Sequence, residues 1–93
     1  MNLIKLTPSQ LSIINLVLQV DTEWKAKQYP IGELVIASEI FKAIKQCVED
    51  DKFVEGNINF SSEQKVFISK AIDERNWGVV DAEAVFELKE LLK

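Results

Sequence analysis

The same helix-start signal occurs twice in this chain, and it constrains the fold more than any other feature. The first copy is Leu6-Thr7-Pro8-Ser9-Gln10 and the second is Phe60-Ser61-Ser62-Glu63-Gln64. In each copy a hydroxyl side chain can accept a hydrogen bond from the backbone N–H three residues later. The glutamine at that later position can return a hydrogen bond, which makes a capping box. We therefore predict helices that begin at residues 7 and 61.

Turn residues place the end of the first helix and the start of the next. Pro30 disfavours helical geometry at Tyr29, so the first helix should run to about Lys27. We expect a second helix from Gly32. Its buried face is predicted from a spacing of three and four residues; the members of this face are Leu34, Ala37, Phe41, Ile44 and Val48.

The ends of the last two helices are also predicted from local signals. Asn76 can adopt the left-handed conformation after the third helix, with the next residue, Trp77, folding back on Ile72 as in a Schellman motif. Asp81 is the expected cap of the fourth helix, and Val80 before it should pack on the first turn. Trp24 and Trp77 each lie near the end of the first helix of a hairpin.

These signals predict an all-α protein, a compact four-helix bundle made of two helix hairpins at 7–49 and 61–92. A chain of 93 residues supports one core, so we expect a single helical domain spanning 1–93. The segments 3–6 and 57–60 alternate apolar and polar residues, so they can pair as a minimal two-stranded β-ribbon.

The two hairpins align with each other, and the mismatches carry information. Any two well-capped amphipathic helices align in this way, so the alignment does not decide whether the two hairpins arose by internal duplication. Three apolar residues of the first helix fall opposite three charged residues of the third helix: Leu11, Leu16 and Val20 opposite Lys65, Lys70 and Glu74. Leu16 and Val20 lie outside the core-facing arc. Either the first helix is central and covered by others, or this ridge contacts another chain, including a second copy.

The composition argues against several classes of function. Cys47 is the only cysteine and there is no histidine, which excludes an intrachain disulfide, the histidine-dependent triads and a tetrahedral zinc site. We interpret Cys47 as a core residue. With 15 acidic and 11 basic residues the net charge is −4, the wrong sign for a phosphate-binding surface. We therefore predict no enzyme activity, no cofactor and no nucleic-acid partner.

Neither the apolar segments nor the N-terminus indicates a membrane or an export route. The densest apolar stretch, 11–20, contains polar residues and is shorter than the roughly 20 apolar residues that a bilayer crossing requires. The first residues, Met1 to Lys5, lack the order of a signal peptide. We expect a cytoplasmic protein without a membrane partner.

The segment 51–62 resembles part of an EF-hand calcium loop, because Asp51 and Gly56 occupy its first and sixth positions. A functional loop also needs oxygen ligands at the third position and a glutamate at the twelfth. Here these positions hold Phe53 and Ser62, which favours an acidic helix exit followed by a turn. A small-ligand or ion-binding helical domain built on this segment is the alternative function.

Exclusion therefore favours a non-enzymatic protein–protein interaction module, such as a small acidic inhibitor, an adaptor, an antitoxin-like protein or a phage accessory protein. Glu83, Glu87 and Glu90 form an acidic stripe on the fourth helix, which either docks on a basic partner or is simply solvated. The candidate contact residues are this stripe and the ridge on the first helix, Leu11, Leu16 and Val20. The partner is another protein, and a homo-oligomer through the first helix is a further expectation.

Overall fold

The computed structural model describes residues 3–93; Met1 and Asn2, which begin the N-terminal segment considered above, lie outside the described residues. The fold is mixed α/β, because four helices are joined by two small antiparallel sheets within residues 3–93. The predicted all-α four-helix bundle is therefore wrong. In chain order the elements are β1 Ile4–Leu6, α1 Pro8–Gln19, α2 Ile31–Lys45, β2 Val48–Glu49, β3 Lys52–Phe53, β4 Gly56–Ile58, α3 Ser62–Asp73, a 3-10 turn Val79–Asp81 and α4 Ala82–Leu91.

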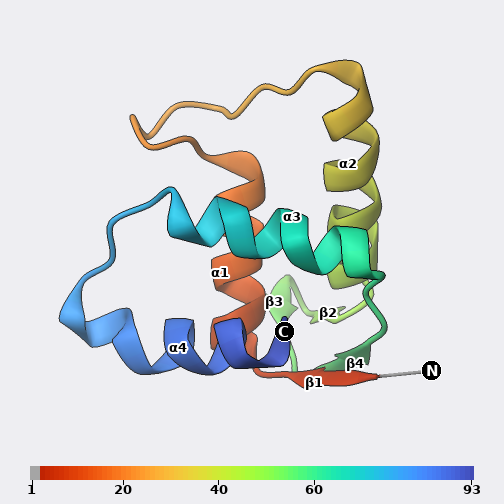
Figure 1. Cartoon of the computed structure of the whole chain (residues 1–93). Helices are drawn as coiled ribbons and strands as arrows, with labels where there is room; N and C mark the ends of the chain where they lie inside the picture. Colours follow the sequence, from red (N-terminus) through yellow and green to blue (C-terminus); the bar gives the residue numbers. More distant parts are fainter. Residues whose placement is uncertain (1–2) are drawn as a thin grey trace.

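The helices do not run alongside one another as bundle helices do. In Figure 1, α3 and α4 extend across α1, whereas α2 runs roughly along it. α1 packs against α2, α3 and α4, so it occupies the central position that was one of its two alternatives. A helix that contacts neighbours on several sides needs apolar residues on several sides. This explains why α1 is more apolar than a surface helix.

The expected β-ribbon is present as the first sheet. β1 pairs antiparallel with β4, with Ile4 opposite Ile58 and Leu6 opposite Gly56. The side chains of Ile4, Leu6 and Ile58 are buried, whereas Lys5 between them is exposed. A Cβ added at Gly56 would overlap the Sγ of Cys47, so glycine allows the strand to approach the core. Cys47 is buried there, as predicted.

A second sheet lies just after α2, where the sequence predicted only the end of the second helix followed by a turn. β2 pairs with β3 through Val48 opposite Phe53 and Glu49 opposite Lys52. The two residues between the strands, Asp50 and Asp51, have φ angles of 52° and 63°. Two consecutive left-handed residues are the geometry of a type I′ hairpin turn. Asp51 therefore belongs to a hairpin turn, and the EF-hand-like segment 51–62 contains two short strands, β3 and β4, which belong to different sheets.

Both predicted capping boxes are confirmed. Gln10 N donates to Thr7 Oγ1 at 3.2 Å and Thr7 N donates to Gln10 Oε1 at 3.0 Å. The equivalent distances for Ser61 and Gln64 are 3.1 Å and 2.9 Å. These boxes satisfy backbone N–H groups that the first helical turn leaves without partners.

The predicted helix ends are less accurate. α1 ends at Gln19 rather than near Lys27, because Val20 is extended and forms a bridge with Ala26. The left-handed conformation expected at Asn76 is wrong, although Trp77 does fold back, donating from Nε1 to Ile72 O at 3.0 Å.

The predicted start of the fourth helix is also wrong in detail. Asp81 makes no side-chain cap hydrogen bond. Val80 is 97% exposed, so it does not pack on the first turn of α4. A 3-10 turn precedes the helix instead, and Asp81 N donates to Gly78 O at 3.1 Å.

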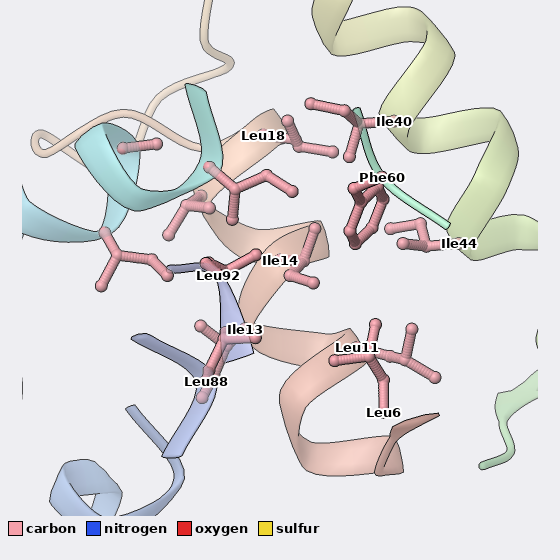
Figure 2. Close-up of a cluster of buried hydrophobic side chains, with 14 of the residues drawn as sticks. Leu6, Leu11, Ile13, Ile14, Leu18, Ile40, Ile44, Phe60, Leu88 and Leu92 are labelled. Atoms are coloured by element: carbon pink, nitrogen blue, oxygen red, sulfur yellow. The ribbon is translucent and has the colours of Figure 1, made fainter. Parts of the chain in front are cut away.

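Buried apolar side chains from the four helices and from the β1–β4 sheet form one core in residues 3–93. Figure 2 shows Leu6, Leu11 and Ile14 near the start and middle of α1, with Ile40 and Ile44 of α2 on one side and Leu88 on the other. The predicted buried face of α2 is rotated from the observed one. Ala37 and Ile44 are buried as expected, but Ile40 is also fully buried and Leu34 is 50% exposed.

Candidate protein-binding surfaces

The outer side of α2 exposes three large apolar side chains. Ile31 is 82% exposed, Leu34 50% and Val35 53%. At about 100° per residue these three fall on the side of α2 opposite Ile40. Ser38 lies among them and is also exposed. Together, Ile31, Leu34, Val35 and Ser38 are called the α2 outer face below.

A groove of about 370 Å³ adjoins this face, between the end of α1, the connection at 26–29 and α2. Such a volume lies within the range of about 300–1,000 Å³ that is typical of ligand pockets. The residues that line it are mostly apolar or aromatic: Leu18, Gln19, Ala26, Lys27, Tyr29, Leu34, Ala37, Ser38 and Phe41. We call it the α1–α2 groove.

Hydrogen bonds hold the wall of this groove that comes from the 26–29 connection. The Tyr29 hydroxyl donates to Leu18 O at 2.8 Å, and Lys27 N donates to Gln19 O at 2.8 Å. Burial of the phenol, followed by the charges of Glu74 and Glu33, raises the pKa of Tyr29 to about 12. Tyr29 is therefore a neutral hydrogen-bond donor at physiological pH. These hydrogen bonds preorganise the wall of the groove, which lowers the entropy lost on binding.

Cations border the groove. Lys27 lines it, with Nζ 5.4 Å from the centre of the Tyr29 ring, and Lys45 Nζ is 5.6 Å from the centre of the Phe41 ring. Lys42 lies three residues before Lys45, on the same side of α2. Within residues 3–93, neither Lys42 nor Lys45 has a carboxylate oxygen at ion-pairing distance. The groove is thus an apolar site with two lysines on its α2 side, Lys42 and Lys45, whereas Lys27 on the opposite wall is paired with Glu74 at 3.8 Å.

The outer face of α4 combines an aromatic side chain with acidic ones. Phe86 is 68% exposed. Glu83 and Glu90, three residues before and four residues after it, share its side of the helix, and Glu87 lies beside it. All three glutamates are exposed, and Glu90 pairs with Lys93 at 2.8 Å. Phe86 also lines a cleft of about 520 Å³ with Trp77, over Ile72 and Val85.

Trp24 is presented at the tip of the connection between α1 and α2. Its φ is 64°, which is uncommon for a bulky residue, and its side chain is 74% exposed. The Asp21 carboxylate holds this turn by accepting hydrogen bonds from Glu23 N and Lys25 N, both at 2.9 Å. Arg75 packs on Trp24, with Cζ 5.0 Å from the ring centre, and lines the same cleft as Trp77. Arg75 thus contacts Trp24 and borders the cleft that Trp77 lines.

The residues expected to make contacts differ in their accessibility. Leu11 is completely buried, and Leu16 and Val20 are partly buried, so the ridge on α1 offers little surface. The glutamates of the acidic stripe are exposed.

The α2 outer face was missed because the periodicity of α2 was fitted to one stripe. α2 carries apolar residues around its whole circumference, more than one buried stripe requires. This surplus was the available signal for an exposed apolar face.

The described residues do not assemble an evident metal site. Within residues 3–93, no three Cys, Asp or Glu side chains are grouped so that they could hold a metal ion. Every helix in this part of the chain falls short of the length and apolar character needed to span a bilayer. A scan against family models and searches of curated proteins and of solved structures find no match.

Proposed function

We propose that this protein is a non-enzymatic interaction module that binds another protein through the α1–α2 groove and the α2 outer face. One observation carries the proposal: Ile31, Leu34 and Val35 are at least half exposed beside a preformed apolar groove. Exposed apolar residues are ordinary when scattered, but a contiguous group next to a groove is typical of an interaction site.

The energetics favour burial of this surface. Complete burial of a Val, Leu or Ile side chain contributes about 1.5–3 kcal/mol. A helix of a partner protein, inserted with its apolar side toward the groove, would cover Leu34 and Phe41 together; this is the helix-in-groove mode of recognition. A small inhibitor or adaptor would use such a site, and the single buried thiol suits a reducing cytoplasm.

The test replaces one groove residue and one matched control. Leu34→Ser removes an apolar side chain that is half exposed and lines the groove, whereas Val66→Ser changes a 67% exposed residue of α3 outside it. Proteins retained from the native host by the immobilised wild-type chain are identified, purified and titrated by calorimetry. We expect Leu34→Ser to weaken binding at least tenfold and Val66→Ser to leave it unchanged. Equal affinity of both variants and the wild type would overturn the proposal.

A further inference from the structure

The exposed surfaces of α2 and α4 are complementary to each other in character. Lys42 and Lys45 lie on the α2 side of the apolar α1–α2 groove, and the outer face of α4 carries Phe86 beside the exposed carboxylates of Glu83 and Glu87. Lys89 and Lys93, which share a cleft with Phe86, are paired with Asp73 and Glu90. We infer that a second copy of this chain occupies the groove, with the α4 outer face of one copy inserted against α2 of the next. This inference rests on the proposed function, because it names a partner for the same groove.

Phe86 provides the apolar anchor. Its ring is 68% exposed, and an exposed aromatic ring is the kind of side chain that dominates binding energy at interfaces. The groove has apolar residues at its base and aromatic rings on its walls, Tyr29 and Phe41. Its volume of about 370 Å³ has room for one phenyl ring. An edge-to-face contact with either ring would add to the area that Phe86 buries.

The charges that flank Phe86 match those that flank the groove. Glu83 and Glu87 have no cation at ion-pairing distance within the described part of the chain. The same is true of Lys42 and Lys45. Glu83 lies about one helical turn, roughly 5 Å, from Phe86 along α4, and Glu87 is the next residue after it. Both glutamates can therefore reach lysines at the edge of the groove when Phe86 is inserted. A net charge of −4 opposes non-specific association, whereas this orientation brings opposite charges together.

The two surfaces are different parts of one molecule, so the contact is head-to-tail. In Figure 1, α2 lies on one side of α1, and most of α4 lies on the other side before its C-terminal end crosses α1. Leu34 and Phe86 are both exposed, so both surfaces are available at once. A head-to-tail contact leaves one unused groove and one unused α4 in every dimer. It therefore builds an open chain or a ring rather than a closed two-fold dimer.

The experiment is sedimentation velocity over a range from micromolar to millimolar protein. We expect the wild type to form dimers and larger species as concentration rises. Leu34→Ser destroys the groove surface and Phe86→Ser destroys the α4 surface, so each variant alone should be monomeric. Mixed together, they retain one intact groove and one intact α4. The mixture should form a one-to-one heterodimer and nothing larger.

A second set of variants tests the charges. Lys42→Glu with Lys45→Glu should weaken self-association at least tenfold, and so should Glu83→Lys with Glu87→Lys. Mixing these two double variants should restore it, because opposite charges face each other again. Val66→Ser, whose side chain is 67% exposed on α3 and lies outside both surfaces, should associate like the wild type. All substituted residues are exposed, and circular dichroism checks that each variant is folded.

Two outcomes would overturn the inference: a wild type that is monomeric at every concentration, or a mixture of Leu34→Ser and Phe86→Ser that remains monomeric. The proposed function fails separately. If the wild type is monomeric but a different captured protein loses affinity for Leu34→Ser, the groove is a binding site and the second copy is the wrong occupant.

Discussion

Tyr29 is the single tyrosine of the chain, and its side chain connects three parts of the molecule. The hydroxyl donates to Leu18 O at the end of α1, and the ring centre is 5.8 Å from that of Phe67 on α3. The ring also forms part of the groove wall. One side chain thus holds the connection between α1 and α2 against both α1 and α3.

The ionisation of Tyr29 is directly measurable because no other phenol is present. Burial, with Glu74 and Glu33 adding negative charge, raises the pKa of Tyr29 to about 12. We predict a titration midpoint near this value by ultraviolet absorbance in the folded protein, against about 10 for an unfolded chain. The neutral phenol is favoured in the fold, so its contribution to stability is complete below pH about 10 and is lost as pH rises toward 12.

Two controls make this titration decisive. Tyr29→Phe should remove the absorbance step. Far-ultraviolet circular dichroism at each pH distinguishes titration of the folded state from alkaline unfolding. A midpoint near 10 in protein that is still folded would contradict the buried, hydrogen-bonded position of the phenol.

At the scale of elements, the capping boxes are the strongest local determinants of the fold. Ser61→Ala removes the acceptor for Gln64 N and should lower the free energy of unfolding by about 1 kcal/mol. Ser62→Ala is the matched control, since it makes the same chemical change one residue inside α3 and breaks no cap. Urea denaturation of both variants measures the difference. Equal losses would show that the Ser61 cap does not stabilise α3.

The accuracy of the sequence predictions follows from the range of the interactions involved. Caps depend on residues three positions apart, so Thr7 and Ser61 could be recognised without the fold. The end of α1 could not be placed from Pro30, because proline marks only where a helix must already have ended. The Val20–Ala26 bridge and the Asp21 turn end α1 earlier. None of Val20, Asp21 and Ala26 is a proline or a glycine, so the sequence gives no strong signal that a helix ends there.

The missed strands and the rotated face of α2 have a different cause. The β2–β3 turn uses Asp50 and Asp51, without the glycine that usually identifies a type I′ turn. The buried side of α2 depends on where α1 and α3 pack against it, which its own periodicity does not specify. The α2 outer face could not be predicted for the same reason: the periodicity of α2 placed Leu34 on the buried side. The acidic stripe on α4 was identified in the sequence because it needs only helical spacing.

At the scale of the whole molecule, Arg75 connects the end of α3 to the exit of α1. Its Nη1 donates to Val20 O at 2.7 Å and to Asp21 O at 3.1 Å, and its guanidinium packs on Trp24. The neighbouring Glu74 lies 3.8 Å from Lys27 Nζ. Two consecutive residues at the end of α3 thus hold the connection between α1 and α2, and the Arg75 hydrogen bonds span 55 and 54 positions in sequence.

This long-range link predicts that Arg75 supports the groove without lining it. Arg75→Gln removes the charge and the planar fork, so the 20–28 connection should open more often. We expect faster amide hydrogen exchange at Lys27, whose N–H bonds to Gln19 O, and weaker binding at the groove because its 26–29 wall is less preorganised. Lys25→Gln is the control, since the Lys25–Glu23 ion pair is exposed and stays within the connection. If both variants exchange and bind alike, the preorganisation of the groove comes from Tyr29 and the backbone of the connection, and the contact with α3 is dispensable.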